Sequence, residues 1–333
     1  MSALFGNLKK VGLNTFFFLL IGVIFLAKIF PDWGTEASPI PLKPITGVGI
    51  SVIFFFYGVK LNPRKLIQDL ANWKLHLVVQ ATTFLIFPLV IIFLYSIWGD
   101  ENSYLWLGTF YLAALPSTVS SSVVMVSLAG GNLPAAIFNA SISSMVGIFI
   151  TPIWMELLLP DSAVAFDLTD TFIKLSLQVL LPLIFGLFLH HLLNNWVSKN
   201  SKSLKNLDQF IILLIVFTAF AESFAEKMFD GKTAAELITL GALMLSFFLL
   251  MMLLMHIIAK ALKFNDADRI TVLFCGSKKS LVQGAVMGRV MFPDPMIFGV
   301  ILLPLMIYHA LQLIVGSAIA QRLGDKYKML NKE

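Results

Sequence analysis

The 333-residue sequence has little charge and a single cysteine. Lys, Arg, Asp and Glu together make up 13% of the chain, which is about half of the ~25% typical of soluble domains. Cys275 has no partner within the chain, which excludes a disulfide scaffold and a zinc site built on cysteines. The net charge of +5 is not gathered on a polar domain, so the sequence does not predict a nucleic-acid partner.

Apolar side chains dominate the sequence instead. They account for 58% of the residues, including thirty Phe and fourteen Met, and the mean hydropathy is +0.87. A soluble globule of this composition would lack the charged residues that its surface needs. The sequence therefore predicts a polytopic membrane protein whose outer surface contacts membrane lipids.

The apolar runs give the number of membrane spans. A transmembrane helix needs about 20 mostly apolar residues, with its backbone hydrogen-bonded within the segment. The connections between the runs are short, and the longest are Phe30–Pro44 and the polar stretch Asn194–Asn206. We predict an all-α fold of ten transmembrane helices, numbered 1 to 10 in chain order, at 12–29, 45–61, 75–98, 104–128, 133–158, 169–193, 207–226, 236–260, 268–291 and 296–322.

The distribution of basic residues sets the orientation. With ten spans, both termini and four of the connections share one side, which carries 16 of the 24 Lys and Arg residues, against six on the other side. The remaining two lie inside helix 9. By the positive-inside rule, the side that carries sixteen is cytoplasmic. We therefore predict a multi-pass integral protein of the plasma (inner) membrane with both termini in the cytoplasm.

Five spans in each half predict two similar halves that face opposite ways across the membrane. When the chain is compared with itself at an offset of 160 residues, two serines of helix 4 coincide with two serines of helix 9: Ser117 with Ser277, and Ser120 with Ser280. These serines fall in the two least apolar spans. We predict two inverted repeats, at 1–158 and 169–322.

Helices 4 and 9 each carry a residue near mid-span that weakens a helix. Pro116 removes a backbone donor and clashes with the preceding turn, and Gly276 leaves helical geometry easily. Interrupted helices at matching positions of two inverted halves are the best sequence indication of a transporter's binding site. Ser and Thr also mediate close helix packing in membranes, but five hydroxyls in the six residues after Pro116 favour a site.

The candidates for binding a substrate or an ion are polar residues at membrane depth. No catalytic residue, metal site or cofactor is predicted. The candidates are Ser117, Thr118, Ser120, Ser121, Ser122, Asn139, Ser141, Gly276, Ser277, Lys278, Lys279, Ser280, Gln283, Gln80, Thr83, His309 and Gln312. His309 and Gln312 are three residues apart and therefore share one face of helix 10.

Lys278 and Lys279 lie too near mid-span to reach water. An intramembrane lysine costs ~2.5–3.5 kcal/mol even on insertion scales and is by default functional. The alternative is a lysine that pairs with a carboxylate only to stabilise the fold, and Glu222 in helix 7 is the candidate partner. On a helix the two lysines point about 100° apart, so only one of them needs to face the interruption, and we expect Lys278.

Four short segments of the chain carry a family pattern. They are Leu128-Ala129-Gly130-Gly131-Asn132, Thr151-Pro152, Val179-Leu180-Leu181-Pro182 with Gly186, and Leu273-Phe274-Cys275-Gly276-Ser277-Lys278-Lys279-Ser280-Leu281. In these segments, and over nearly its whole length, the chain resembles the bile-acid:sodium symporter superfamily, in the branch that contains sodium/bile acid cotransporter seven. The resemblance implies that helices 4 and 9 cross at unwound centres. It also implies a core domain of helices 3–5 and 8–10, a panel domain of helices 1, 2, 6 and 7, and alternating access between the two.

The chain departs from that family at the positions of the sodium ligands. The sodium-coupled members have different residues at Thr83, Val123, Ala136, Ala140, Phe274 and Lys278. An ammonium within ~4 Å of a cation site repels the cation. We therefore expect the sodium sites to be largely lost, with Lys278 as a built-in cation where the relatives hold sodium. Coupling to sodium or to protons is left open.

The leading functional interpretation is a secondary transporter of a small organic solute. The resemblance to bile-acid carriers implies that the solute is anionic and amphipathic. An intramembrane enzyme would need paired acids or a Ser–His arrangement at membrane depth, and the predicted spans carry no such motif. A non-transporting sensor or regulator of ion homeostasis remains the alternative. Neither role requires an oligomer.

Overall fold

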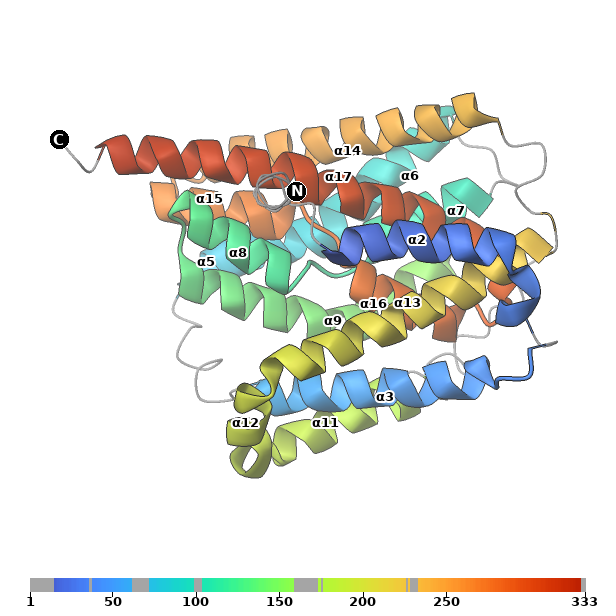
Figure 1. The fold of residues 1–333 in the computed structure, drawn as a ribbon. Helices are drawn as coiled ribbons and strands as arrows, with labels where there is room; N and C mark the ends of the chain where they lie inside the picture. The colour runs from blue at the N-terminus through green and yellow to red at the C-terminus, as the bar shows by residue number, and fades with distance from the viewer. Residues whose placement is uncertain are drawn as a thin grey trace, which may run out of the picture.

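The computed structural model describes residues 15–35, 38–61, 72–98, 104–158, 173–174, 176–225, 227 and 233–330. Within these residues every regular element is helical, which confirms the predicted all-α class. Most of the long helices run in roughly the same direction and pack side by side (Figure 1).

The described part of the first half starts with a helix that is followed by a short 3-10 turn. Its elements are α2 (Thr15–Ile29), η1 (Pro31–Gly34), α3 (Leu42–Lys60), α5 (Trp73–Ala81), the π-helical turn η3 (Thr82–Ile86), α6 (Phe87–Trp98), α7 (Tyr104–Ala114), α8 (Ser120–Ala129) and α9 (Leu133–Leu158). Because η3 is helical, α5 and α6 form one continuous helix.

The second half ends in the longest helix. Its elements are the π-helical turn η4 (Ser176–Leu180), α11 (Leu181–Phe188), α12 (His190–Lys199), α13 (Ser201–Ala225), α14 (Ala234–Ala261), α15 (Asp266–Gly276), α16 (Leu281–Met291) and α17 (Pro295–Leu330). In both halves, a short gap divides one predicted span into two helices of similar length. The gap separates α7 from α8 in predicted helix 4 and α15 from α16 in predicted helix 9.

Five helices in the described part of the chain are long and apolar enough to cross a membrane. They are Trp73–Ile97, Leu133–Leu158, Ser201–Ala225, Ala235–Ala261 and Met296–Asp325, and a bent pair, Ser176–Phe188 with His190–Lys199, is a sixth candidate. The chain is therefore a multi-pass membrane protein. Shorter apolar helices lie at Phe18–Ile29, Pro44–Lys60 and Tyr104–Ala114.

Most of the region predicted as a polar connection, Asn194–Asn206, is helical. Helix α11 ends at Phe188, α12 turns by 97° and runs to Lys199, and α13 begins at Ser201. Helix α12 is amphipathic, with Val197 buried and Lys199 exposed. A helix of this kind is suited to the membrane surface rather than to its interior.

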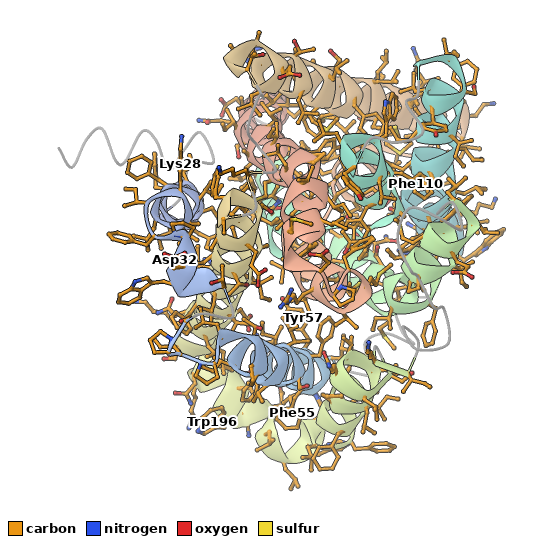
Figure 2. The ribbon with its side chains drawn as sticks, turned by 90° about the vertical axis from the view of Figure 1, so that its right-hand side faces the viewer. Lys28, Asp32, Phe55, Tyr57, Phe110 and Trp196 are labelled. Atoms are coloured by element: carbon orange, nitrogen blue, oxygen red, sulfur yellow. The ribbon has the colours of Figure 1, made fainter. Side chains whose placement is uncertain are left out.

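Helices α3, α11 and α12 form a layer along the lower edge of Figure 1. Glycines bring the first two of these helices together: a Cβ on Gly58 would lie 2.0 Å from the carbonyl oxygen of Leu183, and one on Gly186 would lie 2.0 Å from that of Phe55. Small residues permit such close approach of transmembrane helices. Figure 2 shows this layer end-on, with Phe55 toward α11 and Tyr57 toward the remaining helices.

Helix α13 connects this layer to the rest of the molecule. It packs against α2 and α3 on one side and against α16 and α17 on the other. Its contact with α17 is close, because a Cβ on Gly299 would lie 2.0 Å from the Ser223 Oγ. Helices α14 to α17 and α5 to α9 pack among themselves beyond α13, and they enclose the polar residues described next.

Candidate functional site

Two non-helical segments lie in the interior of the molecule. One, residues 115–119, separates α7 from α8, and the other, residues 277–280, separates α15 from α16. We call them the first and second interruption. All of their side chains are buried except that of Val119, which is 41% exposed. The interruptions lie where Pro116 and Gly276 weaken a helix locally.

Hydrogen bonds join the two interruptions directly. The backbone N–H of Ser280 donates to the carbonyl of Pro116 at 3.0 Å, and the hydroxyl of Ser117 donates to the carbonyl of Cys275 at 2.7 Å. The hydroxyl of Ser122 donates to the carbonyl of Phe274 at 3.3 Å. Each interruption therefore supplies partners for backbone groups that the other has released from its helix.

Side chains also bond to the carbonyls at the end of α7. A helix leaves its last four carbonyls without partners inside the helix, and a buried carbonyl without a partner costs free energy. Thr151 donates to the carbonyl of Ala114 at 2.8 Å. The ammonium of Lys279 donates to those of Ala113 and Leu115, both at 2.7 Å.

The second interruption is bonded by α17 as well. The Tyr308 hydroxyl donates to the carbonyl of Ser277 at 2.7 Å. Gln312 bonds both backbone groups of Lys279, accepting from its N–H at 2.9 Å and donating to its carbonyl at 2.8 Å. The Gln312 amide also lies 2.8 Å from the His309 Nδ1, so these two residues share a helix face, as the sequence predicts.

Lys279 is fully buried, and every donor of its ammonium is used. In addition to the carbonyls of Ala113 and Leu115, it donates to the carbonyl of Thr83 at 2.6 Å. An ammonium has three N–H donors, and three carbonyls accept them. The ring of Phe87 lies 4.1 Å from the same nitrogen, within the range of a cation–π contact.

Lys278 is also fully buried, but its partners are weaker. Its ammonium donates to the carbonyl of Ser121 at 3.3 Å and contacts the sulfur of Met125, and a thioether is a weak acceptor. The ring of Phe274 lies 5.7 Å away. Two close neighbours in the sequence thus have very different surroundings.

Both lysines reach across to residues before and after the first interruption. Only one was expected to face this region, but residues 278–280 are not helical, so the 100° separation of a helix does not apply. The recorded contacts of both ammonium groups are carbonyls, a thioether and aromatic rings, and none is a carboxylate. The alternative of a purely structural lysine–carboxylate pair gains no support. Glu222 instead interacts electrostatically with Arg289.

A cluster of hydroxyls lies at the beginning of α8. Thr118 and Ser122 share a hydrogen bond of 2.6 Å, and Ser121 donates to Thr118 at 2.8 Å. No side chain caps the N-terminus of this helix in the described structure. The side chain of Ser120 lies outside the described part of the structure. The beginning of a helix carries a partial positive charge, so this end of α8 combines a cluster of hydroxyls with a charge that favours an anion.

Four other candidates have side chains whose hydrogen bonds lie outside the two interruptions. The amide of Gln80 donates to Asn139 at 3.2 Å, and Asn139 in turn lies 2.9 Å from the His76 Nδ1. Ser141 bonds only to the carbonyl of Ile137 in its own helix. The hydroxyl of Thr83 likewise bonds to Val79, and only its carbonyl reaches the site.

Gln283 is 1% exposed, and neither polar atom of its side chain has a hydrogen-bond partner among the described residues. In the pattern Ser-x-x-Gln, the Gln side chain normally bonds to the backbone N–H of the capping Ser. Ser280 does cap α16, but its own N–H is used by Pro116. The contact between the interruptions therefore leaves the Gln283 amide without its usual partner.

The sequence analysis missed a polar joint at one end of these helices. The carboxylate of Asp268, which is 6% exposed, accepts hydrogen bonds from three amides, those of Asn72, Asn132 and Asn265, at 3.1, 2.8 and 2.9 Å. It thereby joins the start of α15 to the α8–α9 turn and to the residue before α5. Asn132 stands in the Leu-Ala-Gly-Gly-Asn segment, which was the only sequence signal for it.

Comparison with known proteins identifies similar chains along almost the whole length. The profile of the SBF-like CPA transporter family matches residues 14–325. The chain is 37% identical to "Uncharacterized protein PA2026" of Pseudomonas aeruginosa, over 93% of this chain and 92% of that protein. It is 36% identical to "Putative symporter YfeH" of Escherichia coli over 96% of each. It is 32% identical to "Sodium/bile acid cotransporter 7-B" of Xenopus laevis, over 94% of this chain and 92% of that protein.

Proposed function

From the premise that this chain belongs to the SBF-like CPA transporter family, we propose that it is a secondary transporter that carries a small organic anion across the membrane by alternating access. The family is one of transporters and not of enzymes, and two of the relatives are named as a putative symporter and a cotransporter. A further part of the proposal is that the solute binds where the two interruptions meet.

The proposed topology has ten spans in two inverted repeats. Two of the spans are broken, one into α7 and α8 and the other into α15 and α16. The hydrogen bonds between the interruptions support this, because they join the two segments whose serines coincide at an offset of 160 residues. Freed backbone groups at such crossings are suited to binding a solute or an ion in the middle of the membrane.

The proposed moving parts are a panel and a core. The panel contains α2, α3, α11 and α13, and the core contains α5 to α9 and α14 to α17. The packing supports this division, since α3 and α11 contact each other closely through Gly58 and Gly186, whereas α13 provides the main contact with the core. Asp268 and its three amides stiffen one end of the core.

The observation that carries the proposal is the buried ammonium of Lys278. It has one long hydrogen bond to a carbonyl and a contact with a thioether, and a buried charge is costly unless it is well paired. The solute's anionic group would complete its surroundings. The N-terminal end of α8 adds a favourable partial charge for the same group.

The proposed transport does not depend on sodium. Ala136 and Ala140 offer no side-chain oxygen, and the ammonium of Lys278 would repel a sodium ion bound within ~4 Å. The name of the Xenopus laevis relative includes sodium and bile acid. For this chain we extend from it only the solute class, an organic anion with an apolar body.

The test is flux into proteoliposomes with sodium, proton and voltage gradients imposed one at a time, using bile acids and simpler amphipathic carboxylates. We expect saturable uptake that does not change when sodium is replaced by choline. Lys278→Gln should reduce uptake at least tenfold, whereas Lys260→Gln, at the exposed end of α14, should leave it unchanged. Binding without flux would instead favour a sensor, and sodium-driven uptake would contradict the proposed coupling.

A further inference from the structure

The ammonium of Lys279 occupies a cage of backbone carbonyls, and local sequence explains why two of them are available. Pro116 and the end of α7 release the carbonyls of Ala113 and Leu115 from helical hydrogen bonding. The N–H that would bond to Ala113 in a continuous helix is that of Ser117, which donates to Ser143 instead, at 2.9 Å. Both carbonyls therefore point to the lysine.

The third carbonyl is released by a different device. Between α5 and α6 the chain makes a π-helical turn, in which the N–H of Phe87 bonds to the carbonyl of Thr82, five residues earlier. In this register the donor for Thr83 would be residue 88, which is a proline and has no N–H. The carbonyl of Thr83 is thus left without a backbone partner, and it accepts from Lys279.

The charge and geometry of the cage fit one compact monovalent cation. Three carbonyl oxygens lie 2.6 to 2.7 Å from the nitrogen. The same nitrogen lies over the ring of Phe87, 4.1 Å from the ring centroid. The C-terminal end of α7 adds the partial negative charge of a helix terminus. Rings of backbone carbonyls are also what potassium channels use to replace the hydration shell of an ion.

We infer that the Lys279 ammonium is a covalently tethered cation, and that the carbonyls of Thr83, Ala113 and Leu115 with the ring of Phe87 form a monovalent-cation site that this side chain fills permanently. The tether joins α5–α6, the end of α7 and the second interruption into one unit. This inference goes beyond the proposed function, because it concerns what holds the site together and not what is transported. Its test measures the thermal stability of the protein and needs no measurement of flux, so its outcome is independent of the proposed function.

Removal of the tether should open the site to a small amine. Lys279→Ala deletes three carbons and the nitrogen, which together have the size and charge of n-propylammonium. In detergent at pH 7, this variant should unfold about 5 °C or more below the unmodified protein, because three buried carbonyls lose their donor. Added n-propylammonium should restore at least half of the loss and should saturate.

Two controls separate charge from the filling of a cavity. Propan-1-ol, which is similar in size but neutral, should restore little of the loss, and so should tetramethylammonium, which has no N–H. Lys278→Ala serves as the matched variant, because its ammonium has only one carbonyl partner, and n-propylammonium should not stabilise it. The unmodified protein should unfold at the same temperature in sodium and in choline chloride.

Several results would overturn the inference. They are a Lys279→Ala variant as stable as the unmodified protein, equal rescue by propan-1-ol, and stabilisation of the unmodified protein by sodium over choline. If Lys279→Ala folds only when n-propylammonium is present, that dependence meets the expectation. If it does not fold even then, Lys279→Gln decides, since its amide can donate to two of the carbonyls: a folded variant less stable than the unmodified protein would support the cage, and one equally stable would contradict it.

Discussion

At the scale of single residues, the interior of this protein contains polar groups with very different degrees of satisfaction. The amide of Gln312 makes hydrogen bonds with both of its polar atoms, whereas that of Gln283 makes none among the described residues. Both side chains are almost completely buried. A buried polar group without a partner is destabilising, and its replacement by an apolar group of similar shape is neutral or favourable.

We therefore expect opposite effects from the same substitution at the two glutamines. Gln283→Leu should leave the unfolding temperature unchanged or raise it, because no hydrogen bond is lost. Gln312→Leu should lower the free energy of unfolding by about 2–3 kcal/mol, because the backbone groups of Lys279 lose their partner. Thermal unfolding of the two purified variants checks this, and a clear destabilisation by Gln283→Leu would show that its amide is bonded after all.

The residue scale also shows what sequence reasoning can and cannot reach. Pro116 and Gly276 act on their own turns, so the sequence alone was enough to single out both residues as points where a helix is weakened. The difference between Lys278 and Lys279 was not, because it depends on the carbonyl of Thr83, which lies 196 positions away and is released by a π-helical turn. The sequence-based choice of Lys278 as the fixed cation stays a prediction, and the carbonyl cage favours Lys279 for that role.

At the scale of helices, polar joints and close glycine contacts fix the arrangement. The Asp268 carboxylate is the acceptor for amides from three separate segments. Such a joint requires side chains that come together only in the folded protein, so hydrophobic periodicity carries no signal for it. The helical form of the connection at Asn194–Asn206 was not predicted, because a polar connection and an amphipathic helix are equally polar.

The Asp268 joint should contribute more to stability than an exposed carboxylate on the same turn. We expect Asp268→Ala to lower the free energy of unfolding by about 2–4 kcal/mol, since charge-assisted hydrogen bonds to a buried group are lost. The matched control is Asp266→Ala, whose carboxylate is 87% exposed and pairs with Arg269 at 3.3 Å. Exposed pairs contribute ~0–1 kcal/mol. Equal unfolding temperatures for the two variants would contradict the proposed role of the joint.

At the scale of the whole molecule, composition was sufficient for the class of fold and for the membrane. In the described ranges, the all-helical structure and the five helices of spanning length follow from long apolar runs with few charges. Composition does not determine the membrane topology, that is, which side of the membrane each connection faces. The topology depends on the count of spans and on the distribution of Lys and Arg in the connections, and it stays a prediction.

The single native cysteine makes that prediction testable with few changes. Cys275 is 1% exposed, so a membrane-impermeant maleimide should label only cysteines introduced at the surface. Asp32 and Ser203 are both exposed; the first lies between helices 1 and 2, and the second lies between helices 6 and 7. In the predicted topology the N-terminus is cytoplasmic. One span precedes Asp32, which places it on the opposite side, and six spans precede Ser203, which place it on the cytoplasmic side. In intact cells, Asp32→Cys should therefore be labelled from outside and Ser203→Cys only after the cells are opened. Labelling of both from the same side would remove the ten-span topology, and with it the argument that the two interruptions are matching parts of inverted repeats.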